Sequence, residues 1–461
     1  MIERNLANTV LEYCLERGAD FAELFLEEKD RTTLHFASNE VERAVVGTDF
    51  GAGLRLFYGT NSVYTYTNDV SRDGLMTVAR SAAALEARAP SRGSLRWQDR
   101  QQPLLHACRI DPSSVELARK AELLRRANEA ARSHDSLIDQ VNITYVDEDQ
   151  RVLVANSEGT FVEDRRVRTR LSISAVASLA GEKQVGAASP GACRGFEFYD
   201  DLDVEAHARE AAETAVRMVR AAYAPTGKMV VVLNNAFGGV IFHEASGHGL
   251  EAYAVARKAS IFGDRMGKAI ASKVVSAVDD GTLPHEWGSQ TYDDEGNLTQ
   301  RTLLIENGIL KSWLVDKLSA RKLGLTETGS GRRESYRYAP VSRMRNTYIL
   351  PGERTQEEMI AATEYGLFAK KMGGGSVNPA TGDFNFAVQE GYLIEKGKIT
   401  RPVRGASLIG NGAVILRNID MVGNDLQLAP GMCGASSGAI PVNVGQPSIR
   451  VRDLLVGGRG E

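Results

Sequence analysis

Apolar residues in the first half of the chain follow a helical spacing in four segments. They recur every three to four positions over residues 1–20, 70–87, 112–134 and 203–224. This period predicts four helices with an apolar face. Gly18 lies near the end of the first helix, and Pro225 and Gly227 follow the last, where these residue types favour a helix end. Residues 90–103 predict a loop between the second and third helices.

Two other segments of the first half alternate between apolar and polar residues, which is typical of strands. Residues 32–69 alternate with interruptions by glycine and predict a β-meander. Residues 137–181 predict a second group of strands, with a turn at 157–159. Within it, the arginine-rich run 164–170 predicts an exposed strand face.

The second half begins with an apolar run and becomes rich in glycine after residue 275. Residues 228–233 predict a buried strand, and the segment after them predicts a helix that carries two histidines. Residues 303–315 and 392–403 each predict two strands joined by a tight Asn-Gly or Lys-Gly turn. We therefore predict an α+β protein with an N-terminal α/β domain of meander sheets and helices (1–224) and a β-rich C-terminal domain (225–461).

Composition narrows the classes of function. The chain has 461 residues, 43% hydrophobic and 25% charged, which is ordinary for a globular protein. A net charge of −4 gives no general attraction to nucleic acid or to an anionic membrane. Four scattered cysteines without paired spacing favour a reducing compartment. No apolar run has the length of a membrane span or of a signal peptide, so we expect a cytoplasmic protein that binds neither membrane nor nucleic acid.

The segment HEASGHGLEAYAV, residues 243–255, carries the candidate chemistry. Its order is close to the H-E-x-x-H signature of zinc proteases, but His243 and His248 are five residues apart. In a regular helix such positions lie about 140° apart, so the two imidazoles would converge poorly on one ion. Glycine permits a local break, and Gly247 lies between the histidines. The spacing therefore predicts a metal site only with a distorted backbone.

The other residues of the site follow less directly from the spacing. Glu244 should point away from its neighbour, which suits a general base that takes a proton from water and passes it to a leaving amine. A catalytic zinc usually has a third protein ligand, for which spacing leaves Glu251, Asp264, His285 and Cys433 open. The alternatives are ordinary: histidines are more often hydrogen-bonded or surface residues than ligands, and a lone cysteine is usually a small buried apolar residue.

Several segments together resemble a known family. HEASGHGLEAYAV resembles the H-E-x-x-x-H motif of the TldD/PmbA metallopeptidases, on the TldD side, and residues 338–349, 373–412 and 424–442 agree with it. The resemblance implies that His243, His248 and Cys433 bind Zn²⁺ and that Glu244 is the general base. It also implies an N-terminal α/β domain, a β-rich C-terminal domain and a dimer, formed with a second copy or with a TldE/PmbA-type subunit.

Candidate substrate-binding residues follow the same segments. The glycines Gly373, Gly374 and Gly375 precede an alternating run with Phe384, which suits a sheet edge where an unfolded peptide adds as a strand. The alternative is a glycine turn beside core phenylalanines. A cluster of arginines is formed by Arg332, Arg333, Arg337, Arg343 and Arg345. It is best explained as a solvated or subunit-contact face, and the steering of substrate carboxylates is a weaker alternative.

The motif and the resemblance together predict a zinc-dependent peptidase, and the resemblance implies that it hydrolyses unfolded peptides or the leader segments of peptide precursors. Two alternatives stay open. One is a non-catalytic, metal-containing subunit that binds peptides or regulates a partner, which an intact Glu244 argues against. The other is a metal-dependent hydrolase of a non-peptide amide, which a panel of substrates would distinguish.

Overall fold

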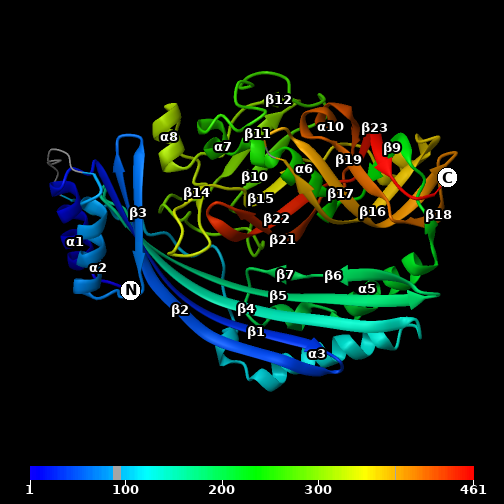
Figure 1. The fold of residues 1–461 in the computed structure, drawn as a ribbon, viewed down its shortest axis with the longest axis horizontal. Helices are drawn as coiled ribbons and strands as arrows, with labels where there is room; N and C mark the ends of the chain where they lie inside the picture. Colours follow the sequence, from blue (N-terminus) through cyan, green and yellow to red (C-terminus); the bar gives the residue numbers. More distant parts are fainter. Residues whose placement is uncertain (87–94, 379, 461) are drawn as a thin grey trace.

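The computed structural model describes residues 1–86, 95–378 and 380–460. A long antiparallel sheet with helices forms the first half, and two further sheets form the second half above it (Figure 1). This architecture confirms the predicted α+β class. Part of the predicted loop, residues 90–94, lies outside the described residues, as do residue 87 and residue 379. Residues 95–103 form neither helix nor strand.

The sheet of the first half consists of two meanders joined along their first strands. Its order is β3-β2-β1-β4-β5-β6, with β7 paired to β5. The strands are β1 (Phe21–Ala37), β2 (Glu40–Tyr58), β3 (Asn61–Thr67), β4 (Ile138–Asn156), β5 (Phe161–Leu179), β6 (Glu182–Ala188) and β7 (Gly191–Ala192). The meander predicted over residues 32–69 is therefore confirmed, but it begins at Phe21. Residues 21–27 are buried on both faces of the sheet, so they lack the polar alternation that marks a half-exposed strand.

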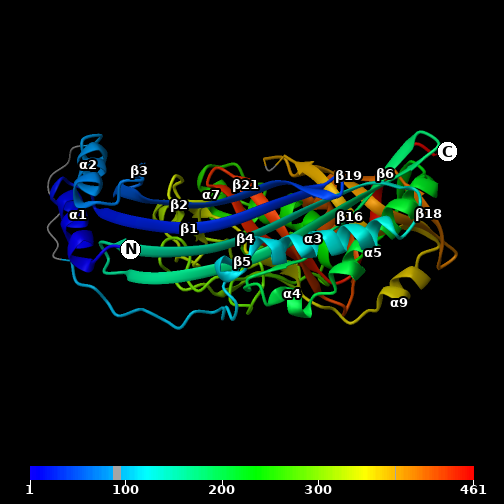
Figure 2. The same ribbon diagram turned by 90° about the horizontal axis from the view of Figure 1, so that it is seen from below.

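Helices pack against both ends of these long strands. They are α1 (Arg4–Glu16), α2 (Arg72–Ala83), the short 3₁₀ helix η1 (Pro112–Ser114), α3 (Leu117–Arg132), α4 (Phe198–Asp201) and α5 (Val204–Arg220). One core joins α1 and α2 to β1 and β2, and another joins α3 and α5 to β4 and β5 (Figure 2). The prediction that the last helix reaches residue 224 is wrong, because β8 (Ala222–Tyr223) pairs with a strand of the second half.

The second half contains two sheets and a two-stranded pair. A six-stranded sheet has the order β12-β11-β10-β15-β22-β21, and a closed ring follows β16-β9-β23-β19-β17 back to β16. The first sheet is built from β10 (Ala277–Asp280), β11 (Arg301–Glu306), β12 (Ile309–Leu310), β15 (Asn346–Ile349), β21 (Gln427–Ala435) and β22 (Gly438–Gln446). The ring is built from β9 (Gly227–Leu233), β16 (Tyr365–Val377), β17 (Asp383–Glu395), β19 (Ser407–Asn411) and β23 (Ile449–Gly457).

The remaining elements surround these two sheets. Four short strands are β18 (Lys398–Arg404) beside β17, β20 (Ile419–Val422) beside β23, and the pair β13 (Gly331–Arg332) and β14 (Val341–Ser342). The helical segments are η2 (Ala236–Gly239), α6 (Val240–Ala245), η3 (Gly247–Leu250), α7 (Ala252–Ala256), α8 (Lys317–Leu323), α9 (Gln356–Ala361) and α10 (Gly412–Asn418). In the described parts of the chain, every helix is too short or too polar to span a bilayer.

Both predicted tight turns of the second half are confirmed. Asn307 and Gly308 join β11 to β12 with φ of 47° and 82°. Lys396 and Gly397 join β17 to β18 with φ of 52° and 72°. Positive φ at both central positions matches the turn type that two-residue hairpins favour.

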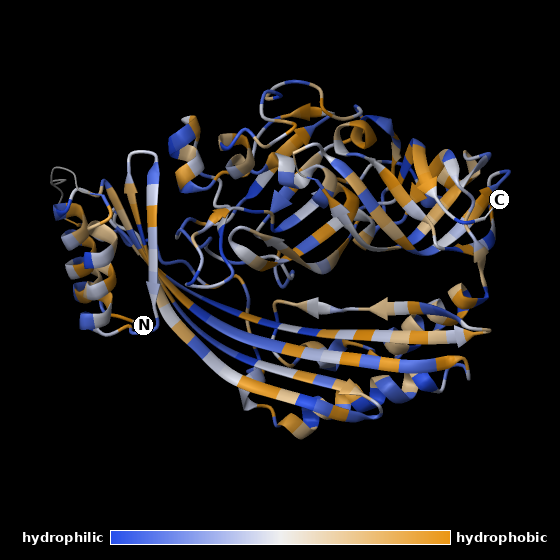
Figure 3. Cartoon of the chain, viewed as in Figure 1, coloured by the Kyte–Doolittle hydropathy of each residue, from blue (hydrophilic) through white to orange (hydrophobic). Residues whose placement is uncertain are grey.

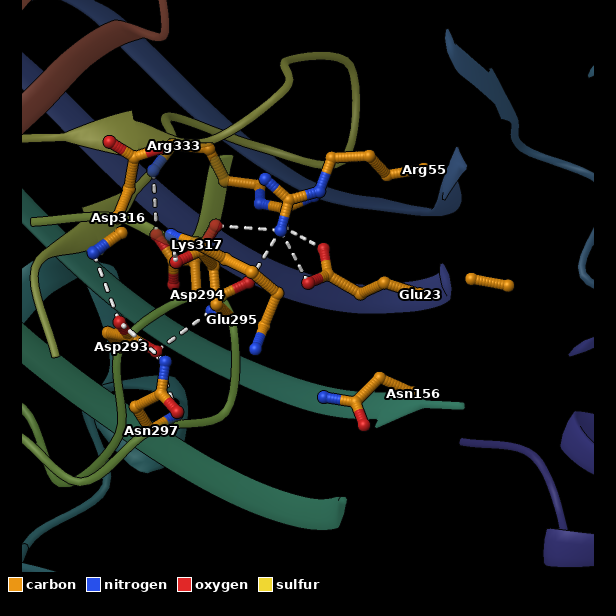
Figure 4. A network of polar contacts seen from close by, with 12 residues as sticks. Glu23, Arg55, Asn156, Asp293, Asp294, Glu295, Asn297, Asp316, Lys317 and Arg333 are labelled. Carbon is orange, nitrogen blue, oxygen red and sulfur yellow. Dashed lines mark hydrogen bonds and ion pairs between the residues drawn. The ribbon is translucent and has the colours of Figure 1, made fainter. Parts of the chain in front are cut away.

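The halves meet through a buried polar network. The Arg55 guanidinium of β2 lies 2.7 Å from a carboxylate oxygen of Glu23 and 2.7 Å from one of Glu295 (Figure 4). The Arg333 guanidinium donates to the second Glu23 oxygen at 2.7 Å. Beside it, Tyr292 and Tyr336 of the second half pack against apolar residues of the sheet. Bands of polar and apolar residues alternate along the strands of the first half (Figure 3).

This contact between the halves corrects two predictions about arginines. The solvated or subunit-contact face is wrong for Arg332, Arg333, Arg343 and Arg345, which are all at most 4% exposed. Only Arg337 of that cluster keeps a largely exposed side chain. The exposed face predicted for 164–170 is also wrong, because Arg166 and Arg168 are each 3% exposed. Alternation identified one face of β5 as polar, but that face lies against the second half instead of solvent.

Candidate metal centre

The backbone breaks between the two histidines of the motif. Helix α6 ends at Ala245, Ser246 takes φ of −131°, and η3 begins at Gly247. The predicted break in the backbone is therefore confirmed, but glycine is needed at position 247 for a different reason from the one predicted. A Cβ atom at Gly247 would overlap the Met344 sulfur, so glycine is required there for close packing.

The break brings four side chains together. One donor atom from each of His243, Glu244, His248 and Cys433 lies within 4.8 Å of all the others. The Cys433 sulfur is 3.3 Å from His243 Nε2 and 3.3 Å from His248 Nε2. A carboxylate oxygen of Glu244 lies 3.6 Å from His248 Nε2. The two imidazole rings are nearly perpendicular, at 83°, and so present their nitrogens to a common point.

Cys433 reaches the histidines from a distant strand. It lies on β21, the edge strand of the six-stranded sheet, where it pairs with Ile440 of β22. Burial alone raises the pKa of this thiol, but the two imidazoles outweigh burial and lower it to about 3. Cys433 is therefore held as the thiolate, which is the form that binds metals.

A second layer of polar residues orients the donors. Glu251 Oε2 lies 3.1 Å from His248 Nδ1, which leaves Nε2 of that ring pointing to the cluster. Burial opposes a charge on His248, but Glu251 raises its pKa well above the ordinary value. The Arg343 guanidinium donates to the Cys433 carbonyl at 2.6 Å and lies 3.8 Å from Glu251. A carboxylate that fixes a ligating histidine in this way is typical of zinc sites.

The donor set fits a zinc ion. Two imidazole nitrogens and one thiolate are ligands that zinc prefers, and tetrahedral zinc places such ligand atoms about 3.5 Å apart. The observed sulfur–nitrogen separations of 3.3 Å are close to that spacing. Among the described residues, His243 Nδ1 is buried without a hydrogen-bond partner, so Nε2 is the nitrogen of this ring that meets the other donors.

Glu244 differs from the other three members in its exposure. Its side chain is 28% exposed, whereas His243 and Cys433 are 1% and 3% exposed. Glu244 is thus the most exposed member of the cluster.

The structure separates the remaining candidates from this centre. Of the four candidates for a third ligand, only Cys433 joins the histidines, and Glu251 lies behind His248 as its hydrogen-bond partner. Asp264 forms an ion pair with Arg265 on the surface. His285 Nδ1 donates to the Cys193 carbonyl, 3.2 Å away.

The predicted substrate-binding residues lie on two neighbouring strands of the ring. Gly373, Gly374 and Gly375 belong to β16 instead of a turn, and Gly375 pairs with Phe386 of β17. The pairing of β16 with β9 ends at Ala369, so among the described strands this part of β16 has a partner on one side only. Phe384 is 3% exposed and packs in the core, so its side chain supports the strand and offers no surface to a peptide.

Glu251 and Arg343 have roles that differ from those predicted. The sequence leaves Glu251 open as a ligand, and its spacing of three residues from His248 is the signal for a hydrogen bond on one helical face. Arg343 is predicted within an exposed cluster. No local pattern could show that it reaches the Cys433 carbonyl, because the two are joined only by the fold.

Two imidazoles, a thiolate and a partly exposed glutamate define a candidate centre of the metallohydrolase class. Three family models agree with this class: domain 1 of the PmbA/TldA metallopeptidases matches residues 22–85, the central domain 110–219 and the C-terminal domain 226–458. The chain belongs to the PmbA/TldD family of metallopeptidases.

Relatives and solved structures agree along the whole chain. Proteins named metalloprotease TldD homolog from Buchnera aphidicola and Haemophilus influenzae are each 33% identical, and each match covers 97% of this chain and 95% of the relative. TldE from Thermococcus kodakarensis has a TM-score of 0.79 at 18% identity, covering 98% of this chain and 99% of its own. A protein described as a modulator of a DNA gyrase, from Thermotoga maritima, has a TM-score of 0.80 at 22% identity with the same coverage. These two likenesses concern the fold alone.

Proposed function

We propose that the chain is a zinc-dependent peptidase that hydrolyses unfolded peptides or leader segments of peptide precursors. The observation that carries the proposal is the convergence of four donor atoms within 4.8 Å, contributed by His243, Glu244, His248 and Cys433. His243, His248 and Cys433 would hold the zinc ion. When bound, zinc would lower the pKa of water and polarise the carbonyl of the peptide.

The chain's own residues supply the proton transfers and the positioning. Glu244 takes a proton from the attacking water and passes it to the leaving amine, and its partial exposure suits both tasks. Glu251 holds the His248 ring in one orientation, and Arg343 holds the backbone of Cys433. A purely structural zinc site would bury all four members, so the exposure of Glu244 argues against a non-catalytic metal-containing subunit.

The substrate is proposed to bind as an extended strand. The outer part of β16, at Gly373–375, offers an edge of backbone groups beside small residues, and such pairing tolerates many peptide sequences. The partner would be a second copy of this chain or a TldE/PmbA-type subunit, and the cytoplasm would be the site of action.

Cleavage of an unfolded peptide by the zinc-loaded chain, followed by mass spectrometry, tests the proposal. Glu244→Ala should retain zinc and lose about 10²- to 10⁴-fold in turnover, because the variant keeps the metal ligands but lacks the base. An equal rate in the variant would contradict the role of Glu244. If neither protein cleaves, the same assay with an added TldE-type subunit separates a need for the partner from a protein that does not cleave peptides.

A further inference from the structure

A cavity rich in arginine lies between the N-terminal sheet and the second half of the molecule. Its volume is about 390 Å³, and its lining includes seven basic and only three acidic side chains. Alternate residues of β5 form one wall, namely Arg166, Arg168 and Arg170, because successive side chains of a strand point to opposite faces. Trp287, Arg332 and Ile440 of the second half form the opposite wall.

Three of these arginines lack an acidic partner. Arg168 donates to the carbonyls of Trp287 and Ser289, at 3.2 and 3.4 Å. Arg332 donates to the carbonyls of Met344 and Pro441, at 2.6 and 2.7 Å. Arg170 donates to a carbonyl of β21 and stacks over Trp287. Among the described residues, none of the three has a carboxylate within ion-pair distance.

The acidic residues of the cavity are already engaged. Asp294 binds the Arg166 guanidinium at 2.6 Å and the Arg333 backbone N–H at 2.7 Å. Glu334 accepts from a backbone N–H of β22, and Glu148 pairs with Arg31. Arg168, Arg170 and Arg332 therefore place three positive charges at the cavity that have no ion-pair partner among the described residues.

Buried cations without a counter-charge are costly, so they indicate an anionic ligand. Arg168 and Arg332 are 3% and 2% exposed. Burial, reinforced by neighbouring Arg345 and opposed by Asp294, lowers the pKa of Arg332 well below its ordinary value. A planar guanidinium pair or triplet is suited to hold a carboxylate through two parallel hydrogen bonds.

The cavity and the metal centre share a wall. Ile440 lines the cavity and packs against Cys433, its partner across the β21–β22 hairpin. Met432, the neighbour of Cys433 on β21, lines the cavity as well. The β21–β22 hairpin thus lies between the metal centre and the positively charged cavity.

We propose that the cavity binds a carboxylate of the peptide substrate through Arg168, Arg170 and Arg332. The identity of the ligand as a peptide rests on the proposed peptidase function, whereas the excess positive charge does not. Either the C-terminal carboxylate or an acidic side chain supplies this chemistry, and both would favour a peptide with a carboxylate at the bound position over a peptide without one.

Binding of three matched peptides by titration calorimetry tests the proposal. The probes are an acetylated neutral peptide with a free C-terminal carboxylate, the same peptide with a C-terminal amide, and the amide with one internal glutamate. The full chain carrying Glu244→Gln is used so that turnover does not consume the probe. The free acid should bind about tenfold more tightly than the amide, as expected for one charge-assisted carboxylate contact.

The third peptide separates the two sources of the carboxylate. Tighter binding of only the internal-glutamate peptide would identify an acidic side chain, and tighter binding of only the free acid would identify the C-terminus. Equal affinity for all three peptides would overturn the proposal.

Arg170→Gln provides the variant, because Arg170 is half-buried and its loss removes no ion pair. It should weaken binding of the free acid to the level of the amide and leave the amide unchanged. Arg165→Gln, on the opposite face of the same strand, is the matched control and should keep the preference. If Arg170→Gln weakens both peptides equally, its effect is on the structure of β21 and the proposal is wrong.

The outcome is separable from that of the proposed function. Cleavage of peptides without any carboxylate preference would leave the peptidase intact and remove the role of the cavity. Carboxylate-dependent binding without cleavage under any condition would support the role of the cavity and contradict the peptidase function.

Discussion

His248 depends on Glu251 for its orientation, because the carboxylate contacts the ring nitrogen that faces away from the other donors. Glu251→Gln removes the charge and should weaken zinc affinity about 10- to 100-fold. Competition with a chromophoric chelator measures this affinity. Glu306→Gln, which alters an exposed glutamate paired with Lys311, should leave it unchanged. A zinc affinity for Glu251→Gln equal to that of the wild type would remove Glu251 from the centre.

Cys433 supplies the thiolate on which the proposed ligand set depends. Cys433→Ala leaves two histidines, which are too few to hold zinc firmly, so the purified variant should contain little zinc by mass spectrometry of the metal. Cys193→Ala is a matched control, because Cys193 is also buried but its sulfur lies 3.6 Å from backbone carbonyls and is not a member of the four-residue cluster. Full zinc content in Cys433→Ala would refute the ligand set.

The residues of the site differ in how far the sequence could predict them. His243, Glu244 and His248 lie within six positions, so their spacing alone predicted both a metal site and a distorted backbone. Cys433 is 190 positions from His243 along the chain, and spacing could not single it out from the other candidates. Only the family resemblance supplied it. The contact of Arg343 with Cys433 could not be predicted, since it depends on the packing of β21 against a distant loop.

At the scale of elements, the break between α6 and η3 decides whether the histidines converge. Gly247→Ala would place a methyl group against the Met344 sulfur and must displace that side chain or the backbone of η3. We expect a lower Tm and weaker zinc binding. Gly434→Ala is the control, because a Cβ there meets open space beside the same centre. An unchanged Tm and zinc affinity for Gly247→Ala would show that the site tolerates a wider break.

Local elements were predictable where the chain itself fixes the conformation. Both hairpins of the second half follow from Asn-Gly and Lys-Gly pairs, because those residues accept the positive φ of the turn. Predictions failed where the second half covers the first. Residues 21–27 do not alternate as a half-exposed strand would, because both of their faces are buried. The arginines of β5 look like an exposed face in the sequence, although the second half covers them.

At the scale of the whole molecule, Glu23 links the two halves. Its two oxygens accept from Arg55 of the first half and Arg333 of the second, and all three side chains are buried (Figure 4). Burial acts to raise the pKa of Glu23, but the two arginines outweigh it and lower that pKa. Glu23 therefore stabilises the folded state as a carboxylate.

Glu23→Gln should destabilise the protein by about 3–5 kcal/mol, the usual cost of breaking a buried ion pair, because two buried guanidinium groups lose a counter-charge. A folded-state pKa below the unfolded value gives stability that is present above the unfolded pKa, about 4.3, and is lost as the pH falls through the folded pKa. The gap in Tm between wild type and variant should therefore be constant near neutral pH and narrow in acid. Calorimetry across this pH range measures it, with Asp139→Asn at an exposed pair as the control.

The same calorimetric experiment bears on the predicted division of the chain after residue 224. If the buried network couples the halves, the wild type should melt in one transition, and Glu23→Gln should lower that transition as a unit. A variant in which only one half melts earlier would mean that the 1–224 and 225–461 regions fold independently and that the network merely aligns them. A Tm gap that widens in acid would contradict the assignment of Glu23 as a carboxylate in the folded protein, because only a group with a raised pKa gains stability as the pH falls.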